Sequence, residues 1–159
     1  MTDAMKSRFV YVIYIRTTPE KLWMALTSTE FARQYWLGIE LDAQWKVGGS
    51  WQIRLPDGRI ADSGEIVEFE PGKRMAIRWQ NQFMPEMKAE GWSLCTMEIE
   101  PAGGETVKLT VTHGMEREGS KFIGAVSNGW PQILSNLKSL LETGSVVLPR
   151  KEFPDQKSA

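Results

Sequence analysis

The spacing of apolar residues changes from strand-like to helix-like and back along this 159-residue chain. Seven segments are rich in β-branched and aromatic residues, and in most of them apolar and polar residues alternate, which is typical of β-strands. They are residues 8–16, 39–45, 50–56, 60–70, 75–80, 92–100 and 106–113. Turns rich in glycine and proline separate most of the later segments, so we expect hairpins and an antiparallel sheet.

Helical spacing occurs in two parts of the chain. Thr18, and then Ser28 or Thr29, are suited to cap two short helices that follow the first strand. A long helix is predicted from residues 118–119 to Gly144, because apolar residues recur there every three or four positions and glycine often ends a helix. The polar residues of this helix that are expected to face away from the core are Lys121, Ser127, Gln132, Asn136 and Lys138.

The order of these elements predicts the architecture. An antiparallel sheet with one exposed face needs cover on the other, and a helix of about 25 residues is about 37 Å long and can lie across it. We therefore expect an α+β helix-grip domain in residues 1–145, with a curved sheet of six or seven strands wrapped around the last helix. Residues 146–159 mix prolines and charges without a period and are predicted to form a flexible tail.

The long helix carries Gly129, Trp130 and Pro131 in succession. Proline cannot donate to the carbonyl of Ser127 and crowds that turn of the helix, so a bend is expected. Two interpretations of Trp130 remain open. Either it fills the core while Gly129 makes room for a side chain of the sheet, or the bend opens a pocket that has the indole in its wall.

Charge and cysteine content narrow the functional classes. A formal net charge of −1 gives no electrostatic reason to expect a nucleic-acid partner. Cys95 is the only cysteine, which excludes an internal disulfide, and its strand position predicts a small buried group. We find no signal-peptide pattern and no apolar run of about 20 residues, so a cytoplasmic protein without membrane insertion is predicted.

No motif for catalysis, a metal or a cofactor is found. His113 is the only histidine, and the glycine pairs lie in hairpin turns rather than between a strand and a helix. His113 is in phase with three apolar residues of its strand, so it should point inward. It is either a structural histidine bonded to the backbone, or a polar anchor or acid–base group for a ligand.

Four charged residues of the predicted strands are considered as further polar groups of the interior. Arg78 and Glu98 are out of phase with the apolar face of their strands and are expected to be exposed. Asp62 and Glu65 flank Gly64, and glycine within a strand is typical of a bulge, so the direction in which they face is left open. No pair of carboxylates for acid–base chemistry can be assigned.

Residues 81–91 lack a period but carry Phe83, Met84 and Met87. Exposed apolar side chains in a loop need a reason. This segment could form a lid over one end of a cavity, fold back on the sheet, or make a dimer contact.

Four stretches of the chain carry a family resemblance. In sequence order, between about residues 10 and 143, they are TPEKLWMALTSTEFARQYW, VGGSW, GEIVEFEPGKRMAIRW and GWPQILSNLKSLLETG. They resemble the activator of Hsp90 ATPase homologue family of the START-like (SRPBCC, Bet v 1-like) superfamily. The resemblance implies a cavity between sheet and long helix. Members of the superfamily bind lipids, hormones and polyketides, and some are cyclases or hydroxylase domains.

Together these observations predict a protein that binds a small apolar, aromatic or lipid-like molecule, with no cofactor and no chemical step. The side chains expected to line its cavity are Trp51, Ile53, Trp79, Met97, Leu109, His113, Phe122, Val126 and Trp130. A polyketide cyclase or aromatase is one alternative, and it requires His113 or a buried acid to face an open pocket. A protein-interaction module with a filled interior is the other. A homodimer is possible, and a chaperone partner is disfavoured because the family is broader than that activity.

Overall fold

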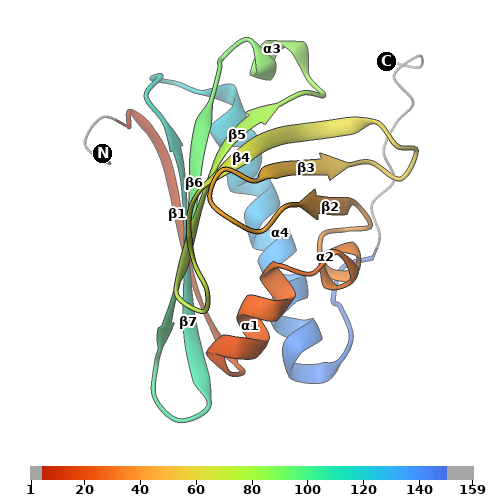
Figure 1. The fold of residues 1–159 in the computed structure, drawn as a ribbon, viewed down its shortest axis with the longest axis vertical. Coiled ribbons are helices and arrows are strands. Elements are labelled where there is room, and N and C mark those ends of the chain that lie inside the picture. The colour runs from red at the N-terminus through yellow and green to blue at the C-terminus, as the bar shows by residue number, and fades with distance from the viewer. Residues whose placement is uncertain (1–4, 150–159) are drawn as a thin grey trace.

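A seven-stranded antiparallel sheet organises the protein, whose computed structural model describes residues 5–149 (Figure 1). The strands are β1 (Ser7–Arg16), β2 (Glu40–Ala43), β3 (Ser50–Arg54), β4 (Ile60–Glu70), β5 (Arg74–Asn81), β6 (Ser93–Pro101) and β7 (Thr106–Met115). Their order in the sheet is β1-β7-β6-β5-β4-β3-β2. The helices are α1 (Pro19–Leu26), α2 (Thr29–Tyr35), α3 (Pro85–Lys88) and α4 (Lys121–Thr143). Figure 1 shows the sheet curving around α4, which confirms the predicted helix-grip fold.

The two short helices begin at the predicted caps. The Thr18 hydroxyl accepts the backbone N–H of Lys21 at 3.2 Å, and the Ser28 hydroxyl accepts that of Phe31 at 3.3 Å. Each bond satisfies one of the N–H groups that the first turn of a helix leaves unpaired. The cap residues therefore set where α1 and α2 start.

The long helix starts later than predicted and ends where expected. Ser120 is its cap, with the hydroxyl accepting the N–H of Ile123 at 3.0 Å, while Gly119 has a positive φ of 64° that is incompatible with a helix. Gly144 ends α4 in the left-handed conformation, with φ of 86°. α4 is one continuous helix through Pro131, and the bend expected there stays a prediction.

Gly64 is not the bulge that the sequence suggested. The register of β4 against β5 shifts between Ile66 and Glu68 instead, and Gly64 itself pairs regularly. A Cβ atom at this position would lie 2.0 Å from the carbonyl oxygen of Arg78. Glycine is needed here because two backbones approach closely.

Asn136 does not face solvent, which corrects the prediction for α4. Its side chain is fully buried, and its Oδ1 accepts the N–H groups of Val147 and Leu148 at 3.0 and 2.7 Å. Its Nδ2 donates to the carbonyl of Leu148 at 3.1 Å. The beginning of the predicted tail is thus tied to α4, while its last ten residues, 150–159, lie outside the described part of the chain.

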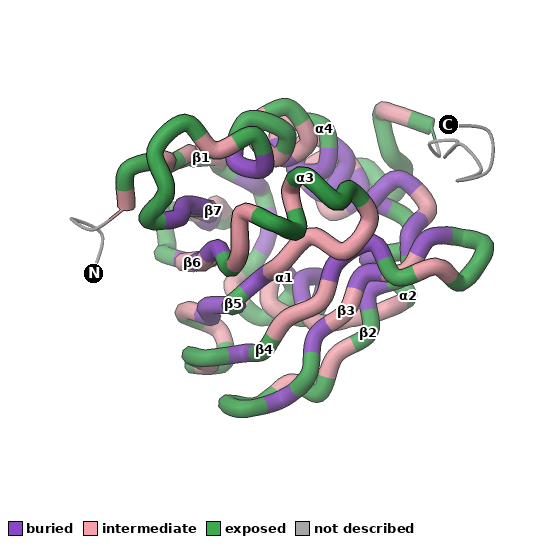
Figure 2. The backbone as a smooth tube through the Cα atoms, turned by 90° about the horizontal axis from the view of Figure 1, so that it is seen from above, coloured by how far each residue is buried: buried purple, intermediate pink, exposed green. Residues whose placement is uncertain are grey.

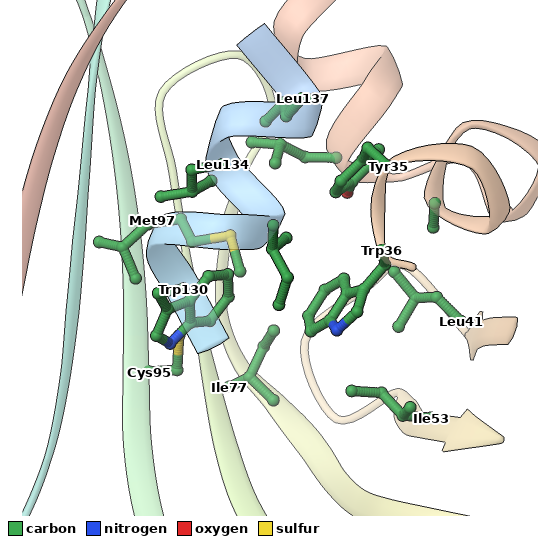
Figure 3. Close-up of a cluster of buried hydrophobic side chains, with 14 of the residues drawn as sticks. Tyr35, Trp36, Leu41, Ile53, Ile77, Cys95, Met97, Trp130, Leu134 and Leu137 are labelled. Carbon is green, nitrogen blue, oxygen red and sulfur yellow. The ribbon is translucent and has the colours of Figure 1, made fainter. Parts of the chain in front are cut away.

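The hydrophobic core lies between α4 and the concave face of the sheet, and α1 and α2 close one end of it. Figure 2 shows buried positions on the inner strands and along one side of α4. Cys95, Leu134 and Leu137 all belong to this core (Figure 3). Burial raises the pKa of the Cys95 thiol, so Cys95 is the small buried group that its strand position predicts.

Candidate functional site

A pocket of about 280 Å³ remains between the sheet and the N-terminal half of α4. Its size is near the lower end of the range for small-molecule sites. The wall comes from the α2–β2 connection, the β3–β4 hairpin, the end of β5, and α4, with Met87 added from α3. Exposed Ala125 and half-buried Val126 also line it, so the pocket reaches the surface beside α4.

Aromatic rings form one side of this pocket. The ring centroid of Trp36 lies 5.4 Å from that of Trp130 and 6.2 Å from that of Trp79. Phe122 continues the group, 6.2 Å from Trp79. Figure 3 shows the indoles of Trp36 and Trp130 in one layer of the core, the first from the end of α2 and the second from α4. We call Trp36, Trp79, Phe122 and Trp130 the aromatic wall.

Asp62 is the one ionisable side chain on the wall of this pocket. It is 9% exposed, and its Oδ1 accepts hydrogen bonds from Trp79 Nε1 at 2.9 Å and Asn81 Nδ2 at 3.0 Å. Within residues 5–149, no group donates to Oδ2. Burial raises the pKa of Asp62 to about 6, although the two hydrogen bonds act in the opposite direction. The carboxylate is therefore mostly ionised at neutral pH, and the pocket wall holds no cation to pair with it.

His113 lies deeper and has no nitrogen left for a ligand. The Ser93 hydroxyl donates to the carbonyl of Trp79 at 2.9 Å, so its oxygen accepts from His113 Nε2 at 2.9 Å. Trp130 Nε1 donates to His113 Nδ1 at 3.2 Å. These bonds assign the neutral tautomer with the proton on Nε2. Full burial lowers the pKa of His113 to about 3, and the predicted backbone bond is replaced by side-chain partners.

Gly129 does not make room for a side chain of the sheet, which was one of the two interpretations of this part of α4. A Cβ atom there would meet nothing within 4 Å, so glycine is not needed to admit a side chain of the sheet. Gly129 and Trp130 both line the pocket, and Trp130 is only 2% exposed. Trp130 therefore fills core space and also forms part of the pocket wall.

Comparison with known proteins places this geometry in a family. The model of the family described as Activator of Hsp90 ATPase homolog 1-like protein matches residues 16–142. The chain belongs to this family. The match covers strands β2 to β7, helices α1 to α3 and almost all of α4, and so includes every residue of the aromatic wall. No curated protein matches the chain in sequence.

Solved structures of similar proteins agree with the assignment to the Activator of Hsp90 ATPase homolog 1-like family. Protein MLL2253 from Mesorhizobium loti is 26% identical with a TM-score of 0.72, over 87% of this chain and 99% of that one. The Aha1 dimer from Colwellia psychrerythraea is 20% identical with a TM-score of 0.70, over 86% and 97%. PFC0360w, an HSP90 activator from Plasmodium falciparum, is 23% identical with a TM-score of 0.70, over 85% and 96%. The last two likenesses show a shared fold.

Five of the nine residues predicted to line a cavity lie on the pocket of this family member: Ile53, Trp79, Phe122, Val126 and Trp130. They come from β3, β5 and α4, so the sheet and the long helix both contribute, as the resemblance implied. Whether they contact a ligand stays a prediction.

The other four residues lie elsewhere. Trp51 and Met97 border a second void of about 10 Å³, which holds no more than a water molecule. Leu109 and His113 are fully buried and line neither space. All four point inward as their strand phase predicts, but core side chains fill the interior at their level.

The segment after β5 contributes to the pocket through one residue. Met87 of α3 lines the pocket, and the carboxylate of Glu90 holds this segment against the start of α4. Glu90 Oε1 accepts from the Ser120 hydroxyl at 2.6 Å and the Phe122 N–H at 3.3 Å, and Oε2 accepts from the Lys121 N–H at 2.9 Å. This cap fixes Phe122, and with it one end of the aromatic wall.

Phe83 and Met84 of the same segment behave differently from Met87. Phe83 is half-buried, and the guanidinium of Arg59 lies over its ring, 5.2 Å from the centroid. Met84 is 42% exposed and lies outside the pocket wall. The lid suggested by the sequence is therefore reduced to Met87, and its role in ligand access stays a prediction.

The remaining charged residues do not form a second reactive centre with the pocket. Arg78 is exposed and lies over the ring of Trp92 at 4.5 Å, and Glu98 is half-buried and bonded to Arg74 at 2.8 Å. Across residues 5–149, no three histidine, cysteine, aspartate or glutamate side chains are grouped so that they could hold a metal ion. In the same part of the chain, no helix is both long and apolar enough to cross a membrane.

Asp62 is the site residue that sequence analysis left undecided. Ile53 pairs with Asp62 while Arg54 pairs with Ile60, so Ala61 is an extra residue in β4. This bulge leaves both Ala61 and Asp62 buried. The sequence did indicate a charged residue near an expected bulge. The direction of the Asp62 side chain could not be predicted without the exact position of that bulge.

Proposed function

We propose that this protein binds a small apolar or aromatic molecule in the pocket between α4 and the sheet. The observation that supports this most is a pocket wall that is apolar except for Asp62 and Asn81, with one carboxylate oxygen that bonds to no group of residues 5–149. Apolar contacts contribute about 25 cal/mol per Å² buried, before the costs of association. Asp62, rather than His113, is the polar group that orients the ligand.

Native mass spectrometry of freshly purified protein tests this proposal. We expect a co-purified small molecule in the wild type and its loss in Val126→Trp, because the larger side chain fills the pocket from α4. Val12→Trp is the matched control, since Val12 is 45% exposed on β1 and lies outside the pocket wall. A bound molecule that persists in Val126→Trp, or a wild type that carries none, would count against the proposal. The same spectra report the assembly state, and the dimeric Colwellia relative supports a homodimer.

A cyclase-type enzyme is the second candidate, and Asp62 favours it. This alternative required a buried acid that faces an open pocket, and a carboxyl with a pKa of about 6 is suited to general acid–base catalysis near neutral pH. Asp62→Asn would then abolish turnover of the bound molecule while its binding remains. Unchanged turnover in Asp62→Asn would reject an acid–base role for this residue.

A protein-interaction role is suggested by the name of the Plasmodium relative, an HSP90 activator. For this chain such a role was expected together with a filled interior. The pocket of about 280 Å³ gives more support to the ligand-binding proposal.

A further inference from the structure

We propose that the molecule held in this pocket is an organic cation, with its charged nitrogen on Asp62 Oδ2 and its apolar body against the aromatic wall. The inference rests on the proposed binding function and names the chemical class of the ligand. It is carried by the charge of the pocket, by the composition of the wall and by the available volume.

Within residues 5–149, no cationic side chain bonds to the carboxylate of Asp62. Both groups that bond to this carboxylate, Trp79 Nε1 and Asn81 Nδ2, are neutral, and both bond to Oδ1. No lysine, arginine or histidine is present on the pocket wall. Buried charges in proteins are normally paired, because desolvation of an isolated ion is unfavourable. A cationic ligand would supply the missing partner at Oδ2.

The aromatic wall favours the same class of ligand. The indoles of Trp36, Trp79 and Trp130 are in mutual contact, with centroid distances between 5.4 and 6.2 Å. The faces of aromatic rings carry partial negative charge and attract organic cations, tryptophan most strongly. An anionic ligand would be repelled by both the rings and Asp62, and a neutral alcohol would bond to Oδ2 without compensating its charge.

The pocket volume limits the size of the ligand. At roughly 30 Å³ per water-sized group, a pocket of about 280 Å³ holds about nine such groups. A single aromatic ring with a short alkylammonium chain matches this size. The half-buried Val126 and exposed Ala125 at the edge of the pocket leave a way in beside α4.

A series of three probes of similar shape tests the proposal. The probes are 2-phenylethylammonium, 2-phenylethanol and phenylacetate, which differ in charge and share the apolar body. We would titrate each into ligand-free protein at pH 7.5 and follow the indole N–H signals by NMR. The expected result is that the ammonium binds at least tenfold more tightly than the alcohol, and that phenylacetate binds most weakly.

Two variants separate the charge of Asp62 from its other roles. Asp62→Asn keeps an oxygen that can accept the Trp79 N–H, and we expect it to bring the ammonium affinity within about threefold of the alcohol affinity. Asp42→Asn removes an exposed carboxylate from the neighbouring part of the sheet, so it should retain the wild-type preference. If Asp62→Asn fails to fold, the order of the three probes in the wild type still decides the matter.

The possible outcomes distinguish this inference from the function on which it rests. Equal binding of the ammonium and the alcohol, or tightest binding of phenylacetate, would overturn the cationic ligand and leave apolar binding in place. If none of the three probes shifts the indole signals at millimolar concentration, the pocket function fails, and the inference fails with it.

Discussion

Two buried polar groups flank Trp79, and their hydrogen-bonding potential is met to different degrees. The ring of His113 lies 4.7 Å from the Trp79 ring, and the Asp62 carboxylate bonds to the indole N–H of Trp79. Both ring nitrogens of His113 have partners, and the side chain is fully buried. Asp62 uses one of its two oxygens and faces the pocket.

The difference indicates which group is structural and which is available for function. A buried polar group is tolerated when its hydrogen bonds are complete, and it destabilises the fold when they are not. The closed arrangement at His113 positions Trp130 and offers nothing to a ligand. The open arrangement at Asp62 leaves one carboxylate oxygen accessible from the pocket as a hydrogen-bond acceptor.

The largest expected effect is a loss of stability on mutation of His113, the group whose hydrogen bonds are complete. His113→Ala removes a fully buried ring and leaves Trp130 Nε1 without its acceptor, so we expect a loss of about 3–5 kcal/mol in the free energy of unfolding. Urea denaturation measures this loss. Lys108→Ala on the outer face of β7 is the control and should stay within about 0.5 kcal/mol of wild type. A loss below about 1 kcal/mol in His113→Ala would mean that the histidine is not the structural centre described here.

The second effect is on pH dependence, where the two groups have opposite signs. The pKa of Asp62 is raised from 3.8 to about 6, so the folded state binds more protons, and this group lowers stability as pH rises from about 4 to 6. The pKa of His113 is lowered from 6.5 to about 3, so the unfolded state binds more protons, and stability increases with pH up to about 6.5. In the wild type the two contributions partly cancel.

Asp62→Asn should separate these contributions. The groups that face Asp62, Trp79 from β5 and Asn81 beside it, do not titrate, and no other ionisable group lines the pocket. We expect the variant to gain about 3 kcal/mol relative to wild type between pH 4 and pH 7, because the contribution of Asp62 to the unfolding free energy is removed. Urea denaturation of the wild type and the variant at several pH values checks this. Parallel curves for Asp62→Asn and wild type would show that the pKa of Asp62 is the same in the folded and unfolded states, so that burial does not raise it.

The fold was predictable because its signals are local. The alternation in the strands, the caps at Thr18 and Ser28, and Gly144 after the last helix all act within a few residues. The inward direction of His113 also followed from its phase with the apolar residues of β7. Its lack of a free nitrogen did not, because its partners Ser93 and Trp130 come from other elements.

The candidate site was less predictable because it depends on contacts between distant segments. Asp62 faces the pocket only because the pairing of β4 with β3 places a bulge at Ala61 and changes the side-chain phase. Asn136 illustrates the same limit on α4. It is on the polar side of the helix by spacing, and it is buried because Val147 and Leu148 return to bond with it.

The smallest expected effect tests whether Asp62 and His113 titrate independently of each other. Trp79→Phe removes the N–H that donates to Asp62, while the Trp79 carbonyl that accepts from Ser93 belongs to the backbone and remains. We expect a loss of about 2 kcal/mol in the free energy of unfolding, and a pKa of Asp62 above 6, because that hydrogen bond favours the ionised form. The carboxyl carbon signal of Asp62, followed by NMR as pH is varied, measures the pKa.

Trp130→Phe is the matched variant for His113. It removes the indole N–H of Trp130, which donates to His113 Nδ1. It should raise the pKa of His113, because Nδ1 is then free to take a proton, and should leave the titration of Asp62 unchanged. The ring signals of His113, recorded over the same pH range in both variants, complete the comparison. If Trp79→Phe moves the titration of His113 as far as that of Asp62, the two groups form one network through Trp79. The separation of a structural histidine from a ligand-binding carboxylate would then no longer hold.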